Sequence, residues 1–487
     1  MVAPSRRLWL TLATMAAVGM CSCTAALGPG YSIENQEIHV QFDPDAPRIH
    51  LDAVYQLRND GNQPLESLEI RLPGRLAFQV ADAKATWDGS ALTSQVSPAN
   101  PRNTLFSLPG LWKISERHTL QLSSDFAPAS AASSHFSFTA DAFFLPSEGW
   151  APDLLPARGF IASGGVPPKQ WRLSVRVPQG FLVHTSGRAA KFSRSGGAVV
   201  VQATQTPADQ YPFVVAGRYH ESPLNAGEQK VLVWSRSTFA PAGLPDAVDA
   251  LSRVVRAFNQ AFGNRSKSGA PLWVVECPVV PGCFTTERSA YAEFLGAEPG
   301  GVSSELASAD TLMMNFSGAP TNLAAAAPAL AASWLGYGQN PGFYDQQAPL
   351  SAFPAFASSL GREAVAGPSV RSEAIRRALQ AIPRSVAKHE PDAPQVLRAK
   401  SFLFFYALQD RYGADVFHRA VNHMLSARRG GGFDLADLIA AFEQETHENV
   451  AEFVRVWMKR PGVPDDFRAR YEGTTSAVAD NSKENKP

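Results

Sequence analysis

At 487 residues the chain is too long for one ordinary domain, and a norm of about 150 residues per domain predicts roughly three units. The 44 basic and 44 acidic residues leave a formal charge of zero, which argues against a nucleic-acid or anionic-membrane binder, because either would need a basic surface. Hydrophobic residues at 45% are typical of a globular protein, and charged residues at 18% are sparse. Disorder is therefore expected only at the ends of the chain.

The first residues have the pattern of an export signal. Two arginines precede an apolar stretch from Leu8 to Met20, which is too short to span a bilayer as a stable helix. The residues before Cys23 resemble a bacterial lipobox, although Cys21 stands where Ala, Ser or Thr is usual. We expect residues 1–23 to be a signal peptide and Cys23 to carry a lipid anchor. The chain would then be a lipoprotein of the bacterial cell envelope; secretion with cleavage after Ala26 is the alternative.

Residues from Tyr31 to about Tyr219 have the pattern of short strands separated by turns. Apolar and polar residues alternate there with the period of a half-buried β-strand. The clearest such segments are Ile38–Phe42, Ile49–Leu57, Leu68–Leu72, Trp171–Val177 and Ala198–Gln202. Because one face of each segment is apolar, residues 31–222 are predicted to form an N-terminal antiparallel β sandwich or saddle.

After Gly227 the pattern changes to a mixture of strands and helices. Strands are predicted at Val231–Trp234 and Leu272–Glu276, on either side of an amphipathic helix from Ala247 to Phe262. Farther on, the clearest predicted helices are Ala399–Tyr412, Asp415–Ser426 and Leu435–Glu445. Residues 228–471 are therefore predicted as an α/β part that continues into a mostly helical part, and residues 472–487 as a disordered polar tail.

The most specific motifs lie near the C-terminus. They are the helix-like segment Phe402–Gly413, the segment Leu438–Glu443, and a closing F-x-x-x-W-x-x-x-P-G-x-P pattern from Phe453 to Pro464. Together they resemble the M1 family of zinc aminopeptidases, which are gluzincins. The resemblance implies a β domain followed by a thermolysin-like catalytic domain, in the order predicted from the strand and helix patterns. It also implies a catalytic zinc ion.

The zinc-binding motif of that family is lost from this sequence. The family uses H-E-x-x-H on a helix, where two histidines hold zinc from one face and the glutamate activates water. The matching helix here is Pro328–Gly336, in which Trp334 fits the family pattern. Pro328 and Ala332 stand at the two histidine positions, and Ala329 stands at the glutamate position. The resemblance therefore implies a helix without metal ligands.

The other two catalytic positions of the family are also changed. Ser351 stands at the spacing of the downstream carboxylate ligand, and a one-residue slip gives Ala352 instead. Neither residue replaces a carboxylate as a zinc ligand. Arg398 stands where the family has the tyrosine that stabilises the transition state. We therefore expect neither zinc nor another cofactor.

No other sequence pattern supplies a convincing catalytic site. None of the histidines is followed by Glu and then by a second His at the H-E-x-x-H spacing. His418 and His423 are spaced so that they lie on different faces of a helix, and we interpret them as ordinary helix residues. Ser385 and Lys388 form an isolated S-x-x-K without the partner motifs that such a site needs.

Two cysteines near the middle of the chain are spaced to close a small loop. If the chain is exported, Cys277 and Cys283 lie in an oxidising compartment, which favours a disulfide. A metal site is less favoured, because two thiols do not fill four positions. We expect reduction to loosen the loop after the strand Leu272–Glu276.

Our leading functional hypothesis is an exported, catalytically inactive M1-like protein. Its remaining cleft would bind a peptide or protein partner. One alternative is a hydrolase with an unrecognised non-metal site. The other is a purely structural envelope lipoprotein whose groove is filled by side chains such as Trp334, Phe353 and Phe356. An open polar cleft would favour binding, and a packed one would favour scaffolding.

Overall fold

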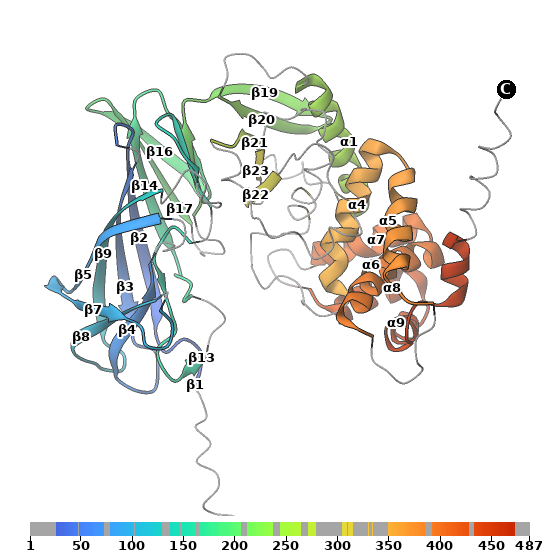
Figure 1. The fold of residues 1–487 in the computed structure, drawn as a ribbon, viewed down its shortest axis with the longest axis horizontal. Coiled ribbons are helices and arrows are strands. Elements are labelled where there is room, and N and C mark those ends of the chain that lie inside the picture. Colours follow the sequence, from blue (N-terminus) through green and yellow to red (C-terminus); the bar gives the residue numbers. More distant parts are fainter. Residues whose placement is uncertain are drawn as a thin grey trace, which may run out of the picture.

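The computed structural model places strands in the N-terminal part of the chain and helices in the C-terminal part (Figure 1). This order is the one predicted from the sequence. The structure describes residues 26–46, 48–72, 78–101, 103–128, 137–146, 149–161, 165–205, 212–236, 244–263, 271–278, 304–308, 310–314, 330, 334, 349–384, 392–427 and 433–472. Within these residues, no helix combines the length and the apolar character needed to cross a membrane.

The largest sheet has eight strands and forms one layer of the N-terminal part. In sheet order they are β16 (Arg188–Ser195), β17 (Ala198–Gln205), β14 (Trp171–Pro178), β2 (Ser32–Asp43), β3 (Arg48–Arg58), β9 (Arg117–Pro128), β5 (Phe78–Trp87) and β6 (Ser90–Ala91). Burial alternates along β3 and β14, as the sequence pattern predicts. The antiparallel prediction is wrong for one pair, because β14 runs parallel to β2. Strands so far apart in the chain have no hairpin that would force them to be antiparallel.

A second sheet packs on the first and closes a sandwich. Its strands are β12 (Asp153–Leu154), β4 (Leu65–Arg71), β8 (Thr104–Trp112) and β7 (Thr93–Val96). Leu68 and Phe106 from this sheet share one hydrophobic core with Ile38 and Leu51 from the large sheet. The short strands β1 (Ala26–Leu27) and β13 (Phe160–Ile161) pair with each other beside it.

A five-stranded sheet begins the second part of the chain. Its order is β19 (His220–Ala226), β20 (Gln229–Ser235), β21 (Leu272–Glu276), β23 (Thr311–Met314) and β22 (Ser304–Ser308). The three middle strands are parallel and the two edge strands are antiparallel to their neighbours. Helix α1 (Leu244–Phe262) follows β20 and buries Val254 and Phe258 in the core that the helices share.

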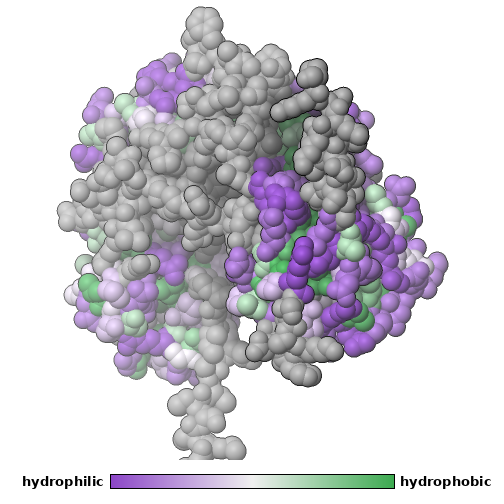
Figure 2. Space-filling view, turned by 45° about the vertical axis from the view of Figure 1, so that its right-hand side comes forward, coloured by the Kyte–Doolittle hydropathy of each residue, from purple (hydrophilic) through white to green (hydrophobic). Residues whose placement is uncertain are grey.

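The C-terminal part consists of packed helices that follow a short 3-10 helix, η4 (Leu350–Ala352). The helices are α4 (Phe353–Ala366), α5 (Ser369–Gln380), α6 (Pro394–Tyr412), α7 (Ala414–Ala427), α8 (Leu435–Thr446) and α9 (Val450–Lys459). Gly413 ends α6 with a φ of 83°, a conformation that favours glycine. On the face drawn in Figure 2, these helices expose mainly hydrophilic side chains, with a strip of hydrophobic ones between them.

The closing sequence motif fixes α6 against α9. The indole of Trp457 is buried and donates to the backbone oxygen of Lys400 at 3.3 Å. The Lys400 ammonium is fully buried and donates to Asp392 at 2.8 Å and to the carbonyl oxygens of Met458 and Arg460. Asp392 also accepts from the backbone N–H of Gly462 at 3.1 Å. The motif therefore has a structural role that does not depend on catalysis.

The two parts meet through a third, smaller core. A sheet of β10 (Ser137–Phe138), β11 (Ala142–Leu145), β18 (Val214–Gly217) and β15 (Leu182–Thr185) supplies one side. Phe144 and Val215 from this sheet pack with Trp234, Val275 and Met313 from the five-stranded sheet. Because all five side chains are buried, the contact is a continuous apolar interface.

Candidate functional site

The described positions that the sequence resemblance matches to catalytic residues of the M1 family lie on two neighbouring elements. Ser351 is on η4 and Arg398 is in the N-terminal half of α6, and these elements contact each other. Both side chains are partly buried. The other positions of interest, Cys23, Cys283, Pro328, Ala329 and Ala332, lie outside the described residues.

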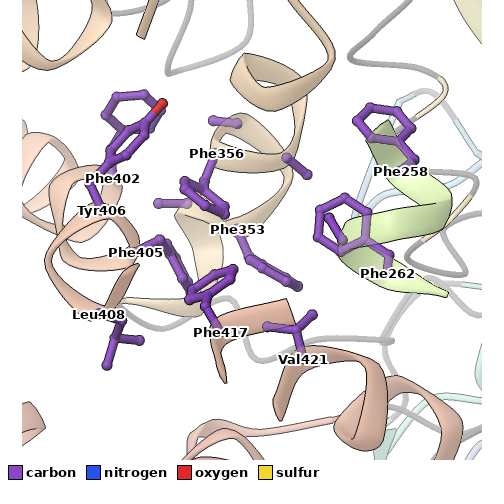
Figure 3. Packing of buried hydrophobic residues seen from close by; sticks show 14 of the residues in the cluster. Phe258, Phe262, Phe353, Phe356, Phe402, Phe405, Tyr406, Leu408, Phe417 and Val421 are labelled. Carbon is purple, nitrogen blue, oxygen red and sulfur yellow. The ribbon is translucent and has the colours of Figure 1, made fainter. Parts of the chain in front are cut away.

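An aromatic core holds these two elements in place (Figure 3). Phe353 directly follows η4, and its ring packs on Phe405 of α6 at 4.9 Å between centroids. Phe262 of α1 meets Phe353 at 5.9 Å, and Phe356 meets Phe405 at 5.4 Å. All four rings are nearly or fully buried. Phe353 and Phe356, which the scaffolding alternative assigns to a groove, are therefore core residues between α1, α4 and α6.

Two residues of the segment that resembles the zinc-binding helix are described, Leu330 and Trp334. Leu330 is fully buried in the helical core. Trp334 is partly buried, packs edge-on against Phe258 at 5.6 Å, and donates from its indole to Asn259 at 3.2 Å. The described part of this segment is thus attached to α1 through aromatic packing and one hydrogen bond.

Arg398 is the most unusual polar residue of the site. Its Nε atom is buried and has no hydrogen-bond partner. No acidic residue lies in the first turn of α6, and Ala393 at the N-cap provides no capping side chain. A guanidinium that is partly removed from water without a partner is unfavourable, because its lost hydration is not replaced.

The described residues at these positions do not fit zinc. A serine hydroxyl is not among the usual protein ligands of zinc, and the guanidinium of Arg398 would repel a cation. Among the described residues, no group of three or more His, Cys, Asp or Glu could hold a metal ion. His418 and His423 both lie on α7; burial lowers the pKa of the partly buried His418, whereas His423 is exposed.

The structure also contains a buried polar cluster that the sequence analysis missed. His184 of β15 stacks on Trp273 of β21 at 4.0 Å and lies 2.8 Å from the hydroxyl of Thr311. That hydroxyl donates to Asp310 at 3.0 Å, so its oxygen accepts from Nε2 of His184. Burial lowers the pKa of His184 to about 4, although the Asp310 carboxylate acts in the opposite direction.

The location of this cluster explains its role and why it was missed. His184 belongs to the N-terminal part, whereas Trp273 and Thr311 belong to the five-stranded sheet. A partly buried histidine between two sheets therefore connects the N-terminal part to the five-stranded sheet. No sequence signal connects His184 to a threonine 127 positions away.

The arrangement of sheets and helices matches that of solved M1 zinc metallopeptidases. An M1 zinc metallopeptidase from Deinococcus radiodurans has this fold: it is 16% identical, with 90% of this chain and 96% of that chain covered and a TM-score of 0.54. A mutant of that enzyme bound to a Tyr-Ser-Ala substrate gives the same identity and TM-score, with coverages of 89% and 95%. No protein-family model and no curated protein matches the chain. The likeness establishes the fold of the M1 zinc metallopeptidases.

Proposed function

We propose that the chain is an M1-like protein without peptidase activity that binds a peptide or protein partner. The observation that carries this proposal is the chemistry at the motif positions. Hydrolysis in the family needs a zinc ion to polarise the carbonyl group and a glutamate to activate water. This sequence offers Pro328, Ala329, Ala332 and Ser351 at those positions, and none of them can hold a metal or accept a proton at neutral pH.

Peptide binding is the part of the family's activity that can remain after the metal chemistry is lost. One structural neighbour was solved with a Tyr-Ser-Ala substrate, which supports a peptide as the ligand class. Substrate binding and bond cleavage use different groups of a protein. A chain with the packed helices of this fold could therefore keep a binding surface without the groups that cleave the bond. The buried packing of Phe353 and Phe356 is what the purely structural alternative expects of these two residues, and no contact in the described parts of the chain specifically favours the non-metal hydrolase.

Hydrolysis of Tyr-Ser-Ala and of an aminoacyl arylamide tests the inactivity. With zinc supplied in excess, we expect product formation no faster than in buffer alone, because no group is present to activate water. A purified M1 zinc metallopeptidase assayed in parallel shows that the conditions support turnover. Chelator-sensitive hydrolysis that copurifies with this chain would contradict the proposal, and chelator-resistant hydrolysis would favour the non-metal hydrolase.

We also propose that the protein is exported to the cell envelope and anchored by a lipid on Cys23. The support is the N-terminal pattern of arginines, apolar residues and a lipobox-like segment before Cys23. In a bacterial host, Cys23→Ser should move the protein from the membrane fraction to the soluble fraction. Equal distribution of wild type and Cys23→Ser would rule out this anchor.

A disulfide between Cys277 and Cys283 belongs to the same proposal. Cys277 directly follows β21 and is only 3% exposed. We expect exported protein to show no free thiol from this pair when it is titrated in denaturant without reductant. Cys277→Ala should expose one reactive thiol at Cys283. Two free thiols in the exported wild-type protein would disprove the bridge.

A further inference from the structure

We infer that Arg398 is an anion-binding residue that recognises a carboxylate group of a bound peptide. The inference rests on the proposed peptide-binding function and goes beyond it by naming the group that is recognised. It is carried by the buried Nε atom of Arg398, by the pairing of two acidic residues close to the ends of α6, and by the position of Arg398 on the helix that contacts η4.

The first observation is that Arg398 has no hydrogen bond or ion pair with the part of the chain that the structure describes. It is partly buried, and its Nε atom is out of contact with solvent and makes no hydrogen bond. Every other partly buried arginine in the described ranges has an ionic, polar or ring contact; these are Arg58, Arg236, Arg362, Arg371, Arg376, Arg377 and Arg468. Arg398 is therefore the exception in this part of the chain.

The second observation is that two carboxylates close to the ends of α6 are already paired. Asp392, which precedes α6, binds the Lys400 ammonium at 2.8 Å and the backbone of Gly462. Asp410, near the other end of α6, pairs with Arg371 at 3.2 Å and accepts from the Tyr471 hydroxyl at 2.7 Å. Neither carboxylate is available to Arg398. An anion from outside the protein is the partner that would complete its hydrogen bonding.

The third observation is the location of Arg398 relative to the family's substrate site. It lies in the N-terminal half of α6, the helix that contacts η4, and η4 carries Ser351. Guanidinium presents a planar fork of N–H donors that matches the two oxygens of a carboxylate. A peptide supplies such a group at its C-terminus or on an acidic side chain. Arg398 stands where the family has a tyrosine. The tyrosine hydroxyl suits a reacting carbonyl group, whereas the guanidinium of Arg398 suits a carboxylate.

Calorimetric titration with three acetylated tripeptides tests the inference and separates the two sources of the carboxylate. The probes are acetyl-Ala-Ala-Ala with a free C-terminus, the same peptide as an amide, and acetyl-Ala-Glu-Ala amide. We expect at least one carboxylate-bearing peptide to bind about tenfold or more tightly than the Ala-Ala-Ala amide. Arg398→Gln should abolish this preference. Arg158→Gln, at an exposed arginine, should preserve it.

The possible outcomes have distinct meanings. Preference for the free C-terminus alone assigns the site to a chain end, and preference for the glutamate peptide assigns it to an acidic side chain. Binding of all three peptides with equal affinity, or a preference that survives in Arg398→Gln, would overturn the anion site and leave peptide binding intact. Failure of all three to bind would overturn both, and the proposed inactivity would still be judged by the hydrolysis assay.

A stability measurement gives a readout that does not depend on a ligand. Because Arg398 has no hydrogen bond or ion pair among the described residues, Arg398→Met should leave the melting temperature of the free protein unchanged or raise it. A residue that stabilises the fold would lower the melting temperature when replaced. A clear decrease for Arg398→Met would therefore show a structural role and overturn the inference.

Discussion

Replacing Lys400 by methionine should lower the free energy of unfolding of the helical part by about 3–5 kcal/mol, because removing one partner leaves the other buried charge without compensation. The Lys400 side chain is fully buried, and its partner Asp392 is 8% exposed. The lost bonds to the Met458 and Arg460 carbonyl oxygens add to the effect. Urea unfolding followed by far-ultraviolet circular dichroism measures it, since this signal follows the helices.

Two further variants serve as controls for this prediction. Lys459→Met removes an exposed lysine from α9, and we expect a change of less than about 0.5 kcal/mol. The double variant Lys400→Met with Asp392→Leu removes both charges, so it should recover much of the lost stability. If Lys400→Met alone changed the unfolding free energy no more than Lys459→Met, the buried ion pair would not have the role assigned to it.

The protein should lose about 3 kcal/mol of stability from His184 as the pH falls from about 6.5 to about 4. Burial favours the neutral imidazole, so the folded pKa lies below the unfolded value of 6.5. The contribution of His184 to the free energy of unfolding is therefore complete above pH 6.5. It decreases as the pH falls, because His184 binds a proton in the unfolded chain at a higher pH than in the folded protein. The groups facing His184 are Thr311, Asp310 and the rings of Phe213, Trp234 and Trp273.

A variant without the imidazole isolates this effect from the titration of carboxylates. His184→Gln keeps a donor for Thr311 but does not titrate, so its unfolding free energy should fall less between these pH values. His423→Gln replaces an exposed histidine on α7, and its unfolding free energy should fall by as much as that of the wild type. Urea unfolding followed by tryptophan fluorescence measures the difference, because Trp234 and Trp273 contact His184. Parallel curves for wild type and His184→Gln would contradict the assignment.

The sequence predicts the parts of the fold that depend on local patterns. Alternation of apolar residues predicted β3 and β14, and the helical pattern of Ala399–Tyr412 predicted the end of α6. The closing motif was recognisable because Trp457 and Gly462 must meet the start of α6, which constrains their spacing. Its survival follows from packing, since these residues hold Lys400 and Asp392 whether or not the protein binds a metal.

Features that depend on distant pairs could not be predicted from the sequence. The parallel pairing of β14 with β2 joins strands from opposite ends of the N-terminal part. The contact of His184 with Thr311 joins two parts of the chain across an interface. The Arg398 position was identified by resemblance, but its missing partner is visible only once the neighbouring carboxylates are seen to be paired.

Zinc content is the most direct test of the account, because the proposed loss of activity follows from the loss of metal ligands. Protein purified after dialysis against zinc should contain far less than one zinc per chain by mass spectrometry. A variant that restores the family pattern is the matched comparison; it carries Pro328→His, Ala329→Glu, Ala332→His and Ser351→Glu. We expect the restored variant to retain close to one zinc per chain. One zinc per chain in the wild-type protein, retained through dialysis, would contradict the account.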